Sequence, residues 1–172
     1  MLDLKQAWRD AVSPGKWIEG RLDTEYSADG GYMAFEGSVS RIDWFLNFFC
    51  LPWLFHGVVV HLGYLLKYKM IQSRMVPLDV VTGFSQGAGM ALLYALDIRS
   101  RGHECKVILF GCPKVLYTKI DPFTGYNVKM TKDIVTMMPP WGKISTTWQI
   151  KIRNKAHWWQ VTKCHMEYPQ HF

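Results

Sequence analysis

Residues 83–87 read Gly-Phe-Ser-Gln-Gly, which places a serine between two glycines at the spacing Gly-x-Ser-x-Gly. A serine that acts as a nucleophile must stand at the tip of a tight turn between a strand and a helix, where side chains two positions before and after it would collide with neighbouring backbone. Gly83 and Gly87 remove that collision. Because ordinary glycine-rich connections match the same pattern, the interpretation depends on the flanking segments. If these are a strand and a helix, the motif predicts nucleophilic catalysis by Ser85.

A serine hydroxyl becomes a good nucleophile only when a base takes its proton and a carboxylate orients that base. In sheet hydrolases with this turn, the order along the chain is serine, acid, histidine. Asp121 and Asp133 follow Ser85 in predicted loops or at strand ends, whereas Asp97 falls on the predicted helix after the turn. Asp133 follows a predicted strand, which places its carboxylate at the same sheet edge as the turn. The residues alone leave the base open among the histidines that come after both acids, His157, His165 and His171.

The segments around the turn have the required character. Residues 78–82 form a short β-prone run, and residues 90–96 are rich in helix-forming side chains. A second short apolar run at 106–110 follows the helix. The order strand, helix, strand predicts a parallel pair with a right-handed crossover. We therefore expect an α/β protein with a mostly parallel central sheet flanked by helices, in which Ser85 lies on a turn after a central strand.

Further elements are expected on both sides of this unit. Apolar residues at helical spacing predict a docking helix over residues 2–12. A strand at 17–26 and a strand at 32–35, with a glycine-containing turn at 28–31, are expected to pair antiparallel. Later strands are predicted at 127–131 and 147–153, with a loop at 138–142 between them.

The segment between Asp43 and Lys67 contains no formally charged residue and is unusually aromatic over residues 44–55. About twenty apolar residues can span a bilayer. Polar residues, glycines and Pro52 interrupt this stretch, which argues against a transmembrane span. An aromatic stretch outside the core is an exposed apolar patch, and such patches usually mark contact surfaces. We expect the first half to be a surface element and residues 57–60 to lead into buried structure.

Composition and length predict one globular domain over residues 1–172. The 172 residues are 49% hydrophobic and 20% charged, which excludes a disordered chain. The cysteines are scattered without metal-ligand spacing, at Cys50, Cys105, Cys112 and Cys164, so we expect reduced structural thiols, with a disulfide as the alternative. Residues 1–10 lack a basic-then-apolar signal pattern, so we expect a protein that is cytoplasmic or released without the usual signal peptide.

The net charge of +6 favours anionic partners. No acidic residue occurs from Ile134 to Met166, where basic residues are interleaved with tryptophans. A solvated strand face is the ordinary explanation of such a segment. The functional explanation is peripheral contact with an anionic membrane surface, because indole rings favour the interface and cations add attraction. A nucleic-acid partner has only the charge in its favour, and we expect none.

Five short segments resemble, in the same order, the motifs of the class 3 lipases, the fungal-type triacylglycerol lipase family of α/β-hydrolases. Residues 33–38 with Asp43-Trp44 are similar to its Phe-Arg-Gly-Ser/Thr and Asp/Asn-Trp segment, and residues 60–64 to its Val-His-x-Gly-Phe. Residues 110–115 resemble its Phe-Gly-Ser-Pro-Arg-Val. The last two matches are Asp133-Ile134-Val135 with Pro139-Pro140, which resembles Asp-x-Val…Pro-Pro, and residues 165–168, which resemble a terminal His-x-x-Tyr.

The resemblance implies a compact α/β-hydrolase that cleaves carboxylic esters, with acyl glycerides or other lipid esters as substrates and without a cofactor or metal. It implies Ser85 as nucleophile, Asp133 as acid and His165 as base. The oxyanion hole would use the backbone N–H groups of Ser38 and Gln86. Residues about 39 to 55 would form a lid, and the candidate lid and substrate-binding residues are Trp44, Phe45, Phe48 and Phe84. The alternative is a non-catalytic protein that docks on a membrane or partner through a hydrolase scaffold, because a fold does not guarantee chemistry.

Three departures from the family pattern bear on the substrate more than on the triad. Glu36 stands where the family usually has arginine, Cys112 where serine is common, and Phe84 where histidine or tyrosine usually precedes the nucleophile. The residues around Ser85 also look like a cutinase elbow.

Overall fold

The computed structural model describes residues 4–13, 18–19, 25–29, 31–37 and 50–153, together with His165 and Tyr168. Its main sheet has seven strands in the spatial order β1 (Ile18–Glu19), β2 (Glu25–Asp29), β3 (Tyr32–Phe35), β6 (Val80–Phe84), β7 (Lys106–Phe110), β8 (Phe123–Met130) and β9 (Thr146–Ile152). β4 (Pro52–Phe55) and β5 (Val58–His61) form a separate antiparallel pair. The helices are α1 (Leu4–Val12), α3 (Leu62–Ile71) and α4 (Gln86–Ser100), with short 3-10 turns η1 (Gln72–Arg74) and η2 (Val135–Met137).

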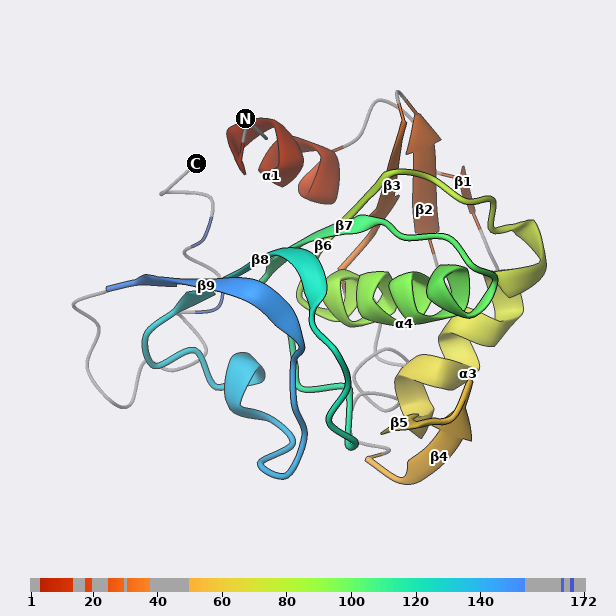
Figure 1. Cartoon of the computed structure of the whole chain (residues 1–172). Helices are drawn as coiled ribbons and strands as arrows, with labels where there is room; N and C mark the ends of the chain where they lie inside the picture. Colours follow the sequence, from red (N-terminus) through yellow and green to blue (C-terminus); the bar gives the residue numbers. More distant parts are fainter. Residues whose placement is uncertain are drawn as a thin grey trace.

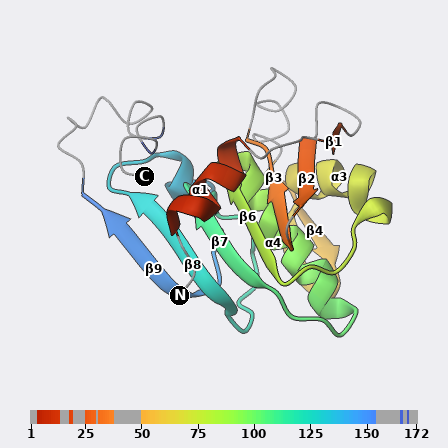
Figure 2. The same ribbon diagram turned by 90° about the horizontal axis from the view of Figure 1, so that it is seen from above.

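The main sheet is parallel from β3 to β9 and antiparallel only where β1, β2 and β3 meet. α1 covers one face and α4 the other, and α3 packs against α4 (Figures 1 and 2). The predicted mostly parallel sheet flanked by helices is therefore confirmed. Phe84 at the end of β6 pairs with Phe110 of β7, which in turn pairs with Val128 of β8. The carboxyl ends of these three strands thus meet at one edge of the sheet.

Successive side chains of a strand point to opposite faces of the sheet, so the sheet has one hydrophobic core on each face. On β7, Val107 and Leu109 join the cluster on the side of α4. Ile108 and Phe110 join the cluster under α1, together with Trp8. The docking helix predicted for residues 2–12 is confirmed from Leu4 onward.

The prediction of one continuous strand over residues 17–26 is wrong, because this run contains β1 and the start of β2. Ile18 pairs antiparallel with Tyr26, so the chain reverses between β1 and β2. Gly20 and Asp23 are turn-forming residue types, and they are the features of this run that favour a reversal over a continuous strand. α3 was not expected from the sequence. Its apolar side chains are not confined to one face, so residues 62–71 lack the amphipathic period that identifies a helix.

The aromatic stretch at 44–55 is described from Cys50 onward, and the part from residue 44 to residue 49 lies outside the described residues. Its end forms β4, where Trp53 and Leu54 are exposed, which confirms an exposed apolar patch on this part of the stretch. Val58 and Val60 on β5 are buried, as expected for residues 57–60. Among the described residues, no helix combines the length and the apolar character needed to cross a bilayer.

Asp97 lies on α4, as predicted, and is buried at the contact of α4 with α3. Its carboxylate accepts hydrogen bonds from the Tyr68 hydroxyl at 2.9 Å and from Gln72 Nε2 at 2.7 Å. His56, on the turn between β4 and β5, contacts it at 2.8 Å, and Arg101 forms an ion pair with it. Asp97 therefore links α3, α4 and the β4–β5 turn through its hydrogen bonds. It has a structural role and does not bond to Ser85 or His165.

Candidate active site

Ser85 occupies the turn between β6 and α4 with φ 56° and ψ −120°, a left-handed conformation that costs a non-glycine residue about 1–3 kcal/mol. Its N–H donates to the carbonyl of Phe110 at 2.9 Å, which fixes the turn against β7. A Cβ on Gly83 would lie 2.4 Å from the carbonyl carbon of Gly87, and a Cβ on Gly87 would lie 2.1 Å from the carbonyl oxygen of Phe35. The steric need for both glycines, inferred from the sequence, is therefore confirmed.

The structure brings Ser85, His165 and Asp133 together from three distant parts of the chain. His165 Nδ1 lies 2.9 Å from Asp133 Oδ2, and His165 Nε2 lies 2.7 Å from Ser85 Oγ. With the proton on Nδ1 donated to the carboxylate, Nε2 is free to accept the proton of the serine hydroxyl. Of the three histidines that the residues left open, the structure describes His165 and joins it to Ser85. His157 and His171 lie outside the described residues.

Asp133 follows β8 and is fully buried. Its Oδ1 accepts the N–H of Val135 at 2.9 Å, and its Oδ2 accepts the Tyr168 hydroxyl at 2.9 Å as well as the His165 bond. Three donors thus compensate a buried carboxylate and fix its orientation. Asp121, the other candidate acid, is exposed in the loop before β8.

Tyr168 supports Asp133 through a hydrogen bond that was not expected from the sequence. Its hydroxyl accepts the N–H of Met130 at 2.8 Å while it donates to Asp133. Burial, together with the nearby Asp133 carboxylate, raises the pKa of the Tyr168 phenol, so the hydroxyl keeps its proton and remains a donor. The tyrosine that ends the His-x-x-Tyr segment is the sequence feature from which this contact could have been predicted.

Phe84 belongs to an aromatic cluster behind the His165 ring. The two rings stack with centroids 4.9 Å apart and an interplanar angle of 18°. Trp8 of α1 packs edge-on against Phe84 at 5.3 Å and stacks with Tyr168 at 6.1 Å. These contacts favour a role for Phe84 in holding the imidazole, while its assignment as a substrate-binding residue stays a prediction. They also explain why α1 docks at this position.

The structure describes the predicted oxyanion hole and the predicted lid only in part. Gln86 is the first residue of α4 and is buried directly after Ser85. The second predicted oxyanion donor, Ser38, and the lid candidates Trp44, Phe45 and Phe48 lie outside the described residues. Cys112, at the position where serine is common in the family, is fully buried, and burial raises the pKa of its thiol well above the usual range. It is a packed side chain rather than a second nucleophile.

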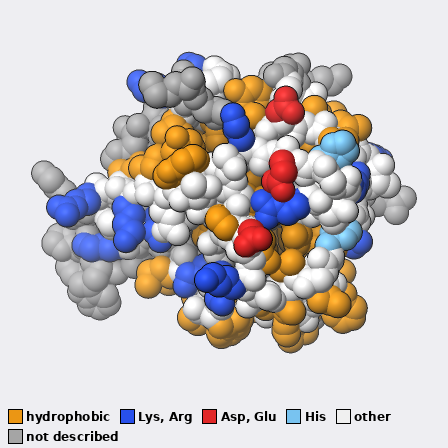
Figure 3. All heavy atoms as spheres, in the orientation of Figure 1, with side chains coloured by type: hydrophobic (Ala, Val, Ile, Leu, Met, Phe, Trp, Pro, Cys, Tyr) orange, Lys and Arg blue, Asp and Glu red, His pale blue; other side chains and the backbone are white. Residues whose placement is uncertain are grey.

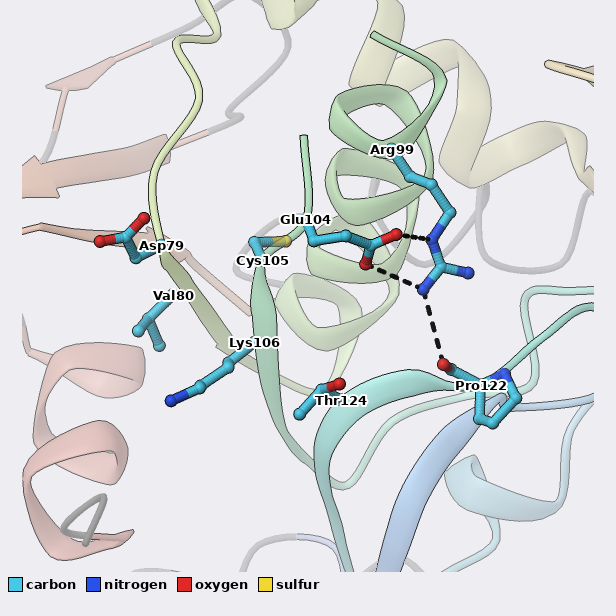
Figure 4. A pocket seen from close by; sticks show the side chains of 8 residues that line it. All are labelled: Asp79, Val80, Arg99, Glu104, Cys105, Lys106, Pro122 and Thr124. Atoms are coloured by element: carbon cyan, nitrogen blue, oxygen red, sulfur yellow. Dashed lines mark hydrogen bonds and ion pairs between the residues drawn. The ribbon is translucent and has the colours of Figure 1, made fainter. Parts of the chain in front are cut away.

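A pocket of about 580 Å³ opens at the other edge of the sheet. Figure 4 shows its lining, where Arg99 pairs with Glu104. Val80, Lys106 and Thr124 place it at the amino ends of β6, β7 and β8, away from Ser85.

In the described part of the chain, no group of three or more His, Cys, Asp or Glu side chains could hold a metal ion.

Tyr168→Phe is expected to lower kcat measured with p-nitrophenyl butyrate about tenfold, because Asp133 loses a donor and His165 is held less firmly. The change also leaves the Met130 N–H without its acceptor, which should reduce the free energy of unfolding by about 1–3 kcal/mol. Tyr94→Phe is the matched control, because the Tyr94 hydroxyl likewise accepts one backbone N–H, from Leu78, and donates to one carbonyl, of Val76. Initial rates and urea unfolding of both variants check the prediction, and equal kcat values would contradict it.

A strained serine at the carboxyl edge of a parallel sheet, with helices on both faces, defines the α/β-hydrolase fold class. The family model for Lipase (class 3) matches residues 32–143, so the chain belongs to the class 3 lipase family. None of the curated protein sequences matches the chain.

Solved structures of fungal lipases share the fold. A fungal lipase bound to an inhibitor has 23% identity and a TM-score of 0.60, with 77% of this chain and 65% of that chain covered. The lipase of Rhizopus microsporus var. chinensis has 20% identity and a TM-score of 0.65, with 90% and 72% covered. The mono- and diacylglycerol lipase of Aspergillus oryzae has 22% identity and a TM-score of 0.58, with 75% and 60% covered. This chain therefore spans about 60 to 72% of the length of these relatives.

Proposed function

We propose that the protein hydrolyses carboxylic esters of lipids through an acyl-serine intermediate. The observation that carries the proposal is the hydrogen-bonded chain from Ser85 through His165 to Asp133, with the serine on the strained turn. Membership of the class 3 lipase family supports the same chemistry.

In the first half of the proposed reaction, Ser85 Oγ attacks the carbonyl carbon of the ester while His165 Nε2 takes the hydroxyl proton. Asp133 stabilises the imidazolium that forms. The carbonyl oxygen becomes an oxyanion, which would accept the N–H of Gln86 and, by the family resemblance, that of Ser38. The bond between the carbonyl carbon and the alcohol oxygen then breaks, and His165 returns its proton to the leaving alcohol.

In the second half, a water molecule takes the place of the alcohol. His165 removes a proton from the water, whose oxygen attacks the acyl-serine carbonyl carbon. The bond to Ser85 Oγ breaks, His165 returns the proton to the serine, and the carboxylic acid leaves. Each donor of an oxyanion hole contributes about 3–4 kcal/mol to the transition state, so the first turn of α4 contributes to the rate in addition to the triad.

The proposed substrates are acyl glycerides or similar lipid esters. The segment that follows Asp133 in the chain carries exposed apolar side chains at Ile134, Met137, Met138 and Trp141. Exposed apolar side chains that follow the triad acid suit an acyl chain better than a polar ester. One of the similar structures is a mono- and diacylglycerol lipase, which supports the same substrate class.

Peripheral contact with an anionic membrane surface is part of the proposal. Lys and Arg side chains gather over the end of β9 on the face shown in Figure 3. Lys129 and Lys151 face each other across β8 and β9, and burial, with the charges of Lys151 and Lys114, lowers the pKa of Lys129. Such a concentration of positive charge favours anionic headgroups, and the attraction weakens as salt rises.

A chain-length series of p-nitrophenyl esters and short triglycerides, measured below and above the solubility limit, tests the substrate class. A lipase should show a rate increase when the substrate forms an interface, whereas smooth saturation would indicate an esterase for soluble substrates. Adding phosphatidylglycerol to phosphatidylcholine vesicles should increase binding at low salt. Binding that does not depend on the anionic lipid would contradict the membrane part of the proposal.

A further inference from the structure

Lys67 lies on α3 with a side chain that is only 2% exposed, although an ammonium group loses its hydration on burial. Its Nζ donates a hydrogen bond of 3.0 Å to Oε1 of Gln86, which is also 2% exposed. Gln86 directly follows Ser85 and begins α4. The buried lysine is therefore linked to the residue next to the serine of the turn.

Helix packing builds this link. A Cβ on Gly89 of α4 would lie 2.9 Å from Cδ1 of Tyr64, so the missing side chain lets the two helices come close. Tyr64 lies one helical turn before Lys67 on α3. The packed helices bring Lys67 within reach of Gln86 and exclude water from the bond. This differs from a pair of mobile surface side chains, which has little energetic effect.

Two physical consequences follow for the proposed reaction. Fixing Oε1 of Gln86 restrains the first residue of α4, whose N–H would face the oxyanion. The ammonium also lies one glutamine side chain away from that N–H, where a positive charge favours the negative charge that develops on the substrate. Because Lys67 and Gln86 are each only 2% exposed, this attraction is weakly screened, and it is in place before the reaction begins.

We propose that Lys67 is a positioning residue for ester hydrolysis, which acts through the Gln86 amide to hold the oxyanion-binding N–H and to place positive charge behind it. The inference rests on the proposed function. It adds a residue of α3, an element that carries none of the three triad residues. A methionine would fill similar space without the cost of a buried ammonium, so packing of the two helices does not by itself require lysine.

Lys67→Met in the full chain tests the inference. We expect kcat for p-nitrophenyl butyrate to fall about tenfold, with KM changed by less than about twofold, because the interaction strengthens as the oxyanion forms. An alkyl boronic acid forms a tetrahedral adduct with the serine and mimics that state, so its affinity should fall about tenfold as well. Lys67→Arg retains a cation and a donor and should recover part of the lost kcat.

Lys69→Met is the matched control on the same helix. Lys69 is exposed, and its Nζ lies 4.9 Å from the centre of the Phe55 ring. This variant loses the same charge from α3 but has no link to Gln86 in the described structure. Its kcat and boronic acid affinity should equal those of the wild type.

Gln86→Leu separates action through the amide from a general effect of charge. The variant keeps the backbone N–H and loses the acceptor of the Lys67 bond. If Lys67 acts through this amide, adding Lys67→Met to Gln86→Leu should lower kcat by at most about twofold more. A full additional loss in the double variant would overturn the proposed route through Gln86.

The outcomes distinguish this inference from the proposed function. Wild-type kcat and boronic acid affinity in Lys67→Met would overturn the inference and leave ester hydrolysis intact. A lower melting temperature with unchanged kcat would assign Lys67 to helix packing alone and overturn it too. If Lys67→Met does not fold, Gln86→Leu decides, because wild-type kcat in that variant contradicts the inference. A wild-type protein that neither hydrolyses esters nor reacts with a fluorophosphonate would refute the proposed function and the inference together.

Discussion

Ser85→Ala is expected to reduce hydrolysis of p-nitrophenyl butyrate by about 10⁶-fold, because no other group then forms the acyl intermediate. Alanine can adopt the backbone of Ser85 at the same cost as serine, and the residue is only partly buried. The melting temperature should therefore stay close to that of the wild type. Initial rates, thermal unfolding and covalent labelling by a fluorophosphonate check the three parts of this prediction.

The same experiment tests whether the three residues act as one unit. His165→Ala should cost nearly as much as Ser85→Ala, and the double variant should lose little more, since each change removes the same proton transfer. His56→Gln is the matched control, because His56 Nε2 also contacts a buried carboxylate, Asp97 Oδ1, at 2.8 Å. It should lower stability and leave kcat unchanged. An inactive His157→Ala beside an active His165→Ala would contradict the assignment of the base.

The sequence predicted the site best where covalent geometry leaves few choices. Gly83 and Gly87 are needed by the turn itself, and the added Cβ positions at 2.4 and 2.1 Å from backbone show why. Asp133 could be placed because it follows a strand next to β7, and parallel strands end at the same edge. His165 required the family resemblance, since nothing local distinguishes it from His157 or His171.

The parts that the sequence did not predict depend on packing between distant segments. α3 has no amphipathic period because its neighbours cover several of its faces, so Lys67 could not be recognised as a buried residue. The stacking of Phe84 on His165 likewise requires α1, which brings Trp8 against both Phe84 and Tyr168. Contacts of this kind follow from the assembled sheet and leave no short pattern along the chain.

Gly87→Ala is expected to give the largest loss of stability among single substitutions on the turn. The added Cβ would lie 2.1 Å from the carbonyl oxygen of Phe35 and 2.6 Å from that of Glu36. Both are backbone atoms of the β3 end, and Phe35 is held in the sheet opposite Gly83, so neither can turn away as a flexible side chain could. The start of α4 must therefore move away from β3, which should lower the free energy of unfolding by about 3 kcal/mol or more.

That movement also predicts a loss of activity in any protein that still folds, because it carries Ser85 away from His165 Nε2, which lies 2.7 Å from Oγ. Gly57→Ala is the matched control. Gly57 has φ +78°, and an added Cβ there meets nothing within 4 Å, so only left-handed strain of about 1–2 kcal/mol is expected. Urea unfolding and kcat of the two variants separate collision from strain. If Gly87→Ala were as stable and as active as Gly57→Ala, the close contact between the turn and β3 would be wrong, and with it the reason why glycine must follow Gln86.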